Sequence, residues 1–141
     1  MTANSLVGTG FAPCCPARHG GTDLVSASLF IRHCALGTDL AILTAVGEVD
    51  LATAPLLRTA LLRCERDGTT RVIIDLSEVG FLAAAGAEVL RATATLADVE
   101  GREVAVVTTA QVDHVLELTG LAGVIPASTS LAEAVAKLGL G

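Results

Sequence analysis

The stretch "RVIIDLSEVGFLAAAGAEVL", residues 71–90, joins a strand to a helix and decides the fold class. Its first part, Arg71–Leu76, is an almost wholly apolar run, which is typical of a central strand covered on both faces. A tight loop follows, and a helix is predicted from about Ala84 to Val99. The residues expected on the inner side of this helix are Val89, Leu90, Thr93, Leu96 and Ala97.

The start of this helix lacks the residue types that usually cap one. An Asp, Ser or Thr at this point accepts a hydrogen bond from a free backbone N–H group of the first turn. The three candidate positions here are Ala83, Ala84 and Ala85. None of them carries a side-chain oxygen, so the sequence raises the question of what this loop does.

The residues before this stretch predict a hairpin and one helix. The short β-like runs Ser28–Cys34 and Leu40–Val46 are separated by the turn "ALGTD", residues 35–39. Pro55 suits the first turn of a helix, and Gly68 suits its end. Between them, one apolar face follows the i, i+3, i+4, i+7 spacing of a helix, formed by Leu57, Ala60, Leu61 and Cys64.

The residues after this stretch continue the alternation of strand and helix. Strands are predicted at Glu103–Thr108 and Gly123–Ile125, and helices at Gln111–Gly120 and within Ser128–Leu138. Strands joined through helices form parallel pairs with right-handed crossovers. We therefore predict an α/β fold with a mixed, mostly parallel β-sheet, an N-terminal hairpin and about four α-helices.

The chain has 141 residues, the length of one ordinary domain. Residues 1–25 are rich in Gly, Pro, Thr and Ala and are expected to be a flexible tail, so the domain is placed at residues 26–141. The four cysteines are expected to be free thiols: Cys14, Cys15, Cys34 and Cys64. A Cys/His metal site with His19 and His33 is conceivable, but the spacings match no familiar zinc pattern.

Composition excludes several classes of partner. The net charge of −6 and the aromatic content of 2%, with no Trp or Tyr, argue against nucleic-acid binding. No apolar run approaches the roughly 20 residues that span a bilayer, and the first residues lack the features of a signal peptide. We expect a cytoplasmic protein with no membrane association.

The sequence holds no recognisable catalytic motif. It has no dinucleotide or P-loop glycine pattern and no nucleophile elbow. His114 follows Asp113 on a predicted helix and is interpreted as an exposed histidine. Glu48 and Asp50 could form a carboxylate pair, but acidic residues near a helix N-terminus, which the helix dipole favours, are the preferred interpretation. We expect a binding module with no cofactor or metal rather than an enzyme.

Four blocks of the sequence together resemble one family. They are "GEVDLATAPLLRTAL", "RVIIDLSEVGFLAAAG", "VAVVTTAQVDHVLELTGL" and "SLAEAVAKL", and they extend over about Ser28 to Leu138. In order and spacing they are similar to the STAS domain, which is found in bacterial anti-sigma-factor antagonists and in the cytoplasmic part of sulfate transporters. The resemblance implies a STAS-like mixed sheet with helices largely on one side.

The resemblance also interprets the three alanines. In the antagonist branch this loop usually reads F-[ILM]-D-S-S/T-G, and its first Ser is phosphorylated by a partner that is both kinase and anti-sigma factor. Phe81, Leu82 and Gly86 match that motif. Ala83 then takes the Asp position, Ala84 the phosphoserine position and Ala85 the position after it. A methyl group cannot accept phosphate, so the usual phosphorylation site is lost.

The resemblance implies an anti-sigma-factor antagonist that binds a kinase-type anti-sigma factor and releases a sigma factor. The partner-binding residues it implies are Glu48, Asp50, Leu51, Thr53, Phe81, Leu82, Ala83, Ala84, Ala85, Gly86 and Glu88. Such a protein would be constitutively competent or regulated in another way, for example through its thiols. Alternatively, the chain is a divergent STAS module that binds another regulatory protein or a small ligand, or the alanines are only good helix formers. The oligomeric state is expected to be a monomer or a weak dimer.

Overall fold

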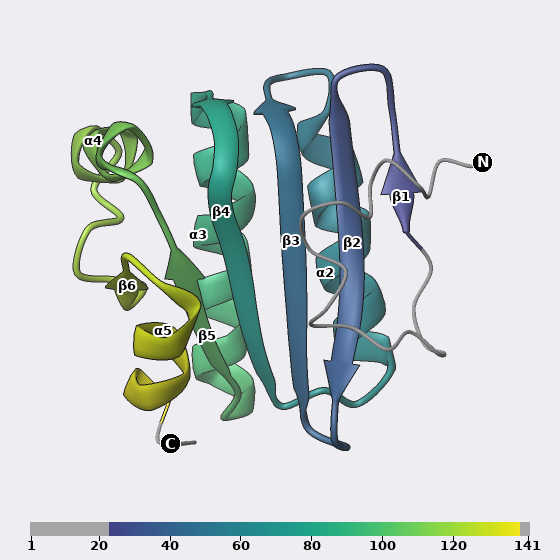
Figure 1. Ribbon diagram of the computed structural model, residues 1–141. Coiled ribbons are helices and arrows are strands. Elements are labelled where there is room, and N and C mark those ends of the chain that lie inside the picture. Colours follow the sequence, from purple (N-terminus) through teal and green to yellow (C-terminus); the bar gives the residue numbers. More distant parts are fainter. Residues whose placement is uncertain (1–22, 139–141) are drawn as a thin grey trace.

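The computed structural model describes residues 23–138. Within them, six strands form one sheet in the order β1-β2-β3-β4-β5-β6, as Figure 1 shows. The strands are β1 (Leu24–Val25), β2 (Leu29–Leu36), β3 (Leu40–Val49), β4 (Arg71–Leu82), β5 (Glu103–Val107) and β6 (Ala127–Ser128). The helices are α2 (Ala54–Arg66), α3 (Ala84–Glu100), α4 (Ala110–Leu118) and α5 (Leu131–Lys137).

The pairing of the strands confirms the predicted mixed sheet. β1, β2 and β3 pair antiparallel, and β3 to β6 pair parallel. Each parallel crossover passes through a helix, as expected for an α/β domain. The predicted hairpin is the pair β2–β3, which turns through Gly37 with a positive φ of 72°.

Helices cover both faces of the sheet. α2 and α3 lie together behind the sheet in Figure 1, and their buried side chains join those of the strands in the larger hydrophobic core. α5 lies in front of β5, where Ala134 and Leu138 pack with Ile73 and Ala105 in a second cluster. Most of the helical mass is thus on one side, with α5 on the other. None of the helices between residues 23 and 138 combines the length and apolar composition needed to span a membrane.

Three predicted boundaries were wrong. β4 runs on to Leu82 instead of ending at Leu76, because its pairing with β3 continues past two register shifts, at each of which β4 has an extra residue. The last strand is β6 rather than Gly123–Ile125, because the Val106 N–H donates to the Pro126 carbonyl at 2.9 Å and the pairing with β5 follows from there. β1 lies inside the predicted tail. Residues 1–22 of that tail, with Cys14, Cys15 and His19, lie outside the described residues.

The inner face of α3 was predicted only in part. Leu90 and Ala97 are buried, as expected, and Gly86 and Ala87 are buried with them. Leu96 is exposed instead, because it faces a groove between α2 and α3 rather than the sheet.

The two described cysteines, Cys34 and Cys64, are both buried, and Cys64 is a free thiol, as predicted. Cys64 belongs to the core under α2, and Cys34 to the cluster under α5. Burial raises the pKa of the Cys64 thiol to about 12, so this group stays protonated at neutral pH. The Cys34 and Cys64 side chains lie in clusters on opposite faces of the sheet, so a bridge between them would require the backbone to move.

Candidate functional site

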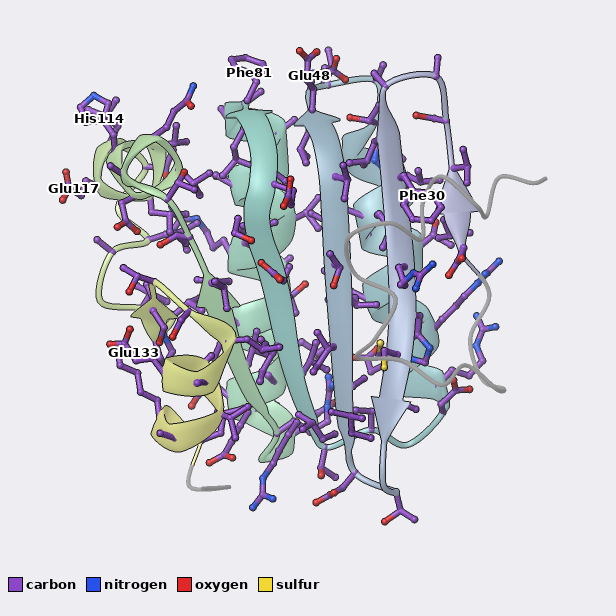
Figure 2. All side chains as sticks on the ribbon, viewed as in Figure 1. Phe30, Glu48, Phe81, His114, Glu117 and Glu133 are labelled. Atoms are coloured by element: carbon purple, nitrogen blue, oxygen red, sulfur yellow. The ribbon has the colours of Figure 1, made fainter. Side chains whose placement is uncertain are left out.

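The parallel ends of β3 and β4 place two predicted site residues side by side. Glu48 of β3 is paired with Phe81 of β4, and Val49 is paired with Leu82. Figure 2 shows Glu48 and Phe81 next to each other at one end of the sheet. The Phe81 side chain is 48% exposed although it is aromatic, and Leu51 in the next loop is 80% exposed. Two large apolar side chains thus face solvent beside a carboxylate.

The loop between β3 and α2 is held by reciprocal bonds between Asp50 and Thr53. The Thr53 N–H donates to Asp50 Oδ1 at 2.9 Å, and the Asp50 N–H donates to Thr53 Oγ1 at 2.9 Å. The Thr53 hydroxyl lies 2.9 Å from the Glu48 carbonyl and 3.1 Å from Asp50 Oδ1, either of which can accept its proton. The bonds from the Thr53 N–H and hydroxyl lower the pKa of Asp50. This arrangement supports a structural role for Asp50 within its own loop over a carboxylate pair with Glu48.

The motif loop itself is tied to β3 through its backbone. The Ala83 N–H donates to the Val49 carbonyl at 2.8 Å, which fixes where α3 begins. Ala83 is the N-cap residue, with the extended backbone that a cap requires (φ −85°, ψ 169°) but without an oxygen to accept a bond. Ala84 is exposed, and Ala83 and Ala85 are half-buried. The backbone therefore has the geometry of a capped helix start, while the side chains present only methyl groups.

Gly86 lets this helix start lie close to the sheet. A Cβ added at Gly86 would lie 2.6 Å from Leu82 Cδ1 and 2.6 Å from Val49 Cγ1, both on buried side chains. Carbon atoms do not approach so closely, so only glycine allows α3 to pack here without a shift. The glycine and the buried Leu82 support the loop from beneath.

The eleven predicted partner-binding residues thus divide by exposure. Leu82, Thr53 and Gly86 are buried beneath the loop, and Asp50, Ala83 and Ala85 are half-buried. The exposed members form what we call the edge surface: Glu48, Leu51, Phe81, Ala84 and Glu88. The buried members shape this surface, and the exposed ones are available for contact.

α4 flanks the edge surface, which the sequence did not indicate. The Gln111 side-chain amide donates to the Gly80 carbonyl at 2.9 Å and so joins the first turn of α4 to the end of β4. His114 is exposed on this helix, as predicted, and Figure 2 places it at the same end of the molecule as Phe81. Gln111 is separated from Gly80 by 31 residues, and no local pattern signals such a contact.

The described residues do not group His, Cys, Asp or Glu side chains in a way that could hold a metal ion. An exposed hydroxyl does occur on β4, where Ser77 Oγ donates to Asp75 Oδ1 at 2.6 Å. The same carboxylate oxygen accepts the Ser77 N–H at 3.0 Å, so Asp75 holds the Ser77 hydroxyl locally within β4. The edge surface therefore offers a partner exposed apolar and acidic side chains.

Comparison with known proteins gives one family. The family model of the STAS domain matches residues 36–134. The anti-sigma-F factor antagonist RsfB of Mycobacterium tuberculosis is 43% identical over 54 residues, which cover 38% of this chain and 44% of that protein. The match thus spans less than half the length of the curated relative.

Solved structures share the same fold. An anti-sigma factor antagonist from Mycobacterium paratuberculosis is 26% identical, with a TM-score of 0.68 over 81% of this chain and 97% of that chain. The unphosphorylated form of the antagonist SpoIIAA gives a TM-score of 0.66 over 79% of this chain and 98% of that chain. At 12% identity, SpoIIAA supports the fold alone.

Proposed function

The chain belongs to the STAS domain family, and we propose that it is an anti-sigma factor antagonist that binds its anti-sigma factor through the edge surface. The observation that carries this proposal is the pairing of Glu48 with Phe81, which exposes an aromatic ring and Leu51 at the motif loop. Exposed apolar groups beside a rim of charge are typical of protein-binding surfaces. The named antagonists among its relatives support the same role.

In this proposal the partner is a kinase-type anti-sigma factor, and the antagonist is constitutively competent. A phosphate would add about −1.5 to −2 charges to an apolar contact and would oppose binding. Ala84, at the position that the family phosphorylates, has no oxygen that could accept phosphate. The protein therefore stays in the binding form whether or not the partner's kinase is active. Its role is binding, and no catalytic step is proposed.

Thiol control receives little support as the alternative mode of regulation. Reactive cysteines are exposed and have a lowered pKa, because the thiolate is the reacting species. Cys34 and Cys64 are buried, and the pKa of Cys64 is raised. The Cys64 thiol is thus unsuited to such control, and we propose constitutive binding instead.

Co-purification with matched variants tests the proposal. Tagged protein is expressed in its native host, and the retained proteins are identified by mass spectrometry. We expect an anti-sigma factor to be retained by the wild type, lost with Phe81→Asp and kept with Val124→Asp. Val124 is a suitable control because it is exposed to a similar degree, 54% against 48% for Phe81.

Retention of the anti-sigma factor by both variants would show that the edge surface is not the interface. Recovery of a different regulatory protein, lost only with Phe81→Asp, would support a divergent STAS module instead. Circular dichroism of each variant checks that the domain stays folded.

A further inference from the structure

A groove lies between α2 and α3, on the side away from α5. Its volume is about 150 Å³. Arg58, Leu62 and Glu65 line it from α2, at the i, i+4, i+7 spacing that places residues on one helix face. Val89 and Leu96 line it from α3, and Val72 and Val104 of the sheet line it between the helices.

The lining of this groove is apolar and partly open to water. Leu62 is 43% exposed and Leu96 is 37% exposed. When an apolar ligand covers exposed apolar side chains in a concave site, their removal from water favours binding. An engineered apolar cavity of comparable volume in another protein holds a benzene molecule. The groove therefore has room for a ligand with about one ring.

Among residues 23–138, the two arginines that line the groove differ in their ion pairs. Arg102 Nη2 lies 2.5 Å from Glu65 Oε2, and Arg102 Nε lies 2.9 Å from Glu100 Oε1, so Arg102 bridges two carboxylates. Arg58 makes no ion pair with any residue from 23 to 138. An apolar groove with one unmatched guanidinium is complementary to an apolar ligand that carries one anionic group.

We infer that this groove binds a small carboxylic acid with an apolar body about the size of one ring, whose carboxylate meets Arg58. This inference goes beyond the proposed function and does not depend on it. Val72 is at the first end of β4, whereas Phe81 of the edge surface is at the other. The groove and the edge surface share no lining residue, because Leu51, Phe81, Ala84, Glu48 and Glu88 are absent from the groove.

Nuclear magnetic resonance titration of the full chain tests the inference with three probes that share one ring. Benzoate carries the anion, benzyl alcohol is neutral and benzylamine is cationic at pH 7. We expect benzoate to shift the backbone amide signals of Leu62, Val89 and Leu96, with a Kd on the order of 1 mM. Benzyl alcohol should bind several-fold more weakly, and benzylamine should not bind at this site.

Two variants with matched controls test which residues are responsible. Arg58→Gln should raise the Kd for benzoate roughly fivefold to tenfold, whereas Arg63→Gln, an exposed arginine of the same helix outside the groove, should leave it unchanged. Ala92→Leu places a larger side chain in the groove and should abolish the shifts. Ala132→Leu, on the exposed side of α5, should not.

The inference would be overturned if benzoate at up to about 20 mM shifted no groove amide, since a Kd of that size is negligible binding. Equal binding of benzoate and benzylamine would also overturn it, as would an unchanged Kd in Arg58→Gln. Because the titrations contain no anti-sigma factor, none of these results depends on whether one binds to the edge surface.

Discussion

Asp50 and Thr53 each accept the backbone N–H of the other, both at 2.9 Å, and so close the loop that leads from β3 into α2. This loop carries the exposed Leu51 beside Glu48. Asp50 and Thr53, two of the predicted partner-binding residues, therefore hold in place the loop that carries Leu51.

Loss of the Thr53 hydroxyl should destabilise the domain. Thr53→Val keeps the shape of the side chain but leaves the Asp50 N–H without its acceptor, and Thr53 is buried. We expect a loss of about 1–3 kcal/mol in the free energy of unfolding, measured by urea denaturation. Thr59→Val is the control, because the Thr59 hydroxyl bonds to the Pro55 carbonyl at an exposed position of the same helix. It should change the free energy by about 0.5 kcal/mol or less, and an equal loss in both variants would contradict this account.

The Asp50 carboxylate should make the free energy of unfolding depend on pH. Hydrogen bonds from Thr53 lower the pKa of Asp50 in the folded state, so ionised Asp50 stabilises the fold above its unfolded pKa, which is about 3.9. That contribution is lost as the pH falls through the folded pKa. We compare the urea midpoints of the wild type and Asp50→Asn at several pH values. The difference should be present at neutral pH and should shrink below the unfolded pKa, whereas a difference independent of pH would contradict the assignment.

A methyl group at position 86 should disturb the support of the motif loop. Gly86→Ala places a Cβ 2.6 Å from carbon atoms of Leu82 and Val49, so α3 must shift away from the sheet. We expect a loss of about 1–3 kcal/mol in the free energy of unfolding. Gly80→Ala is the control, because a Cβ there would meet no atom within 4 Å and Gly80 does not have a positive φ. Similar stability of both variants would show that the space between Gly86 and the Leu82 and Val49 side chains can hold a methyl group.

A cap restored at the start of α3 should stabilise the domain. Ala83 already has the extended backbone of an N-cap, so Ala83→Asp needs no change of backbone to accept an N–H of the first turn. We expect a gain of about 0.5–2 kcal/mol in the free energy of unfolding. Ala92→Asp, at an exposed position in the interior of the same helix, should give no gain. If Ala83→Asp is no more stable than the wild type, those donors are already satisfied by water.

The sequence predicted the elements whose signals are local. The apolar run of β4, the helix spacing of α2 and the helix predicted within Ser128–Leu138 each depend on neighbouring residues, and each is present. The motif loop was found because Phe81, Leu82 and Gly86 retain the family pattern. Of these residues, Leu82 and Gly86 are buried and pack the helix onto the sheet, whereas Phe81 is 48% exposed.

The features that the sequence did not predict depend on contacts between distant residues. The last residues of β4 form a strand because they pair with β3 as far as Val49. The position of β6 is likewise set by its pairing with β5. The contact of Gln111 with Gly80 and the groove beside Leu96 arise only when helices meet across the sheet. The exposure of a side chain also depends on distant contacts. The spacing of residues along the sequence could not show that Leu51 is exposed and Thr53 is buried.

Restoring the family's hydroxyl should restore phosphorylation. We expect the double variant Ala83→Asp, Ala84→Ser to gain one phosphate when it is incubated with ATP and the co-purified kinase-type partner, and then to lose binding. Intact-mass measurement of the wild type under the same conditions should show no phosphate on the motif loop. Stoichiometric phosphate on the wild type at Ser77 or Thr53 would contradict constitutive competence and would indicate a displaced acceptor.

The most direct test of the edge surface is the affinity of Ala84→Glu for the co-purified anti-sigma factor, measured by isothermal titration calorimetry. The substitution places a negative charge within the proposed apolar contact, without any kinase, while Ala136→Glu places the same charge on the exposed side of α5. The account predicts that Ala84→Glu raises the Kd at least about tenfold and that Ala136→Glu leaves it unchanged. An unchanged Kd for a folded Ala84→Glu protein would contradict it, and the three alanines would then be only the start of a helix.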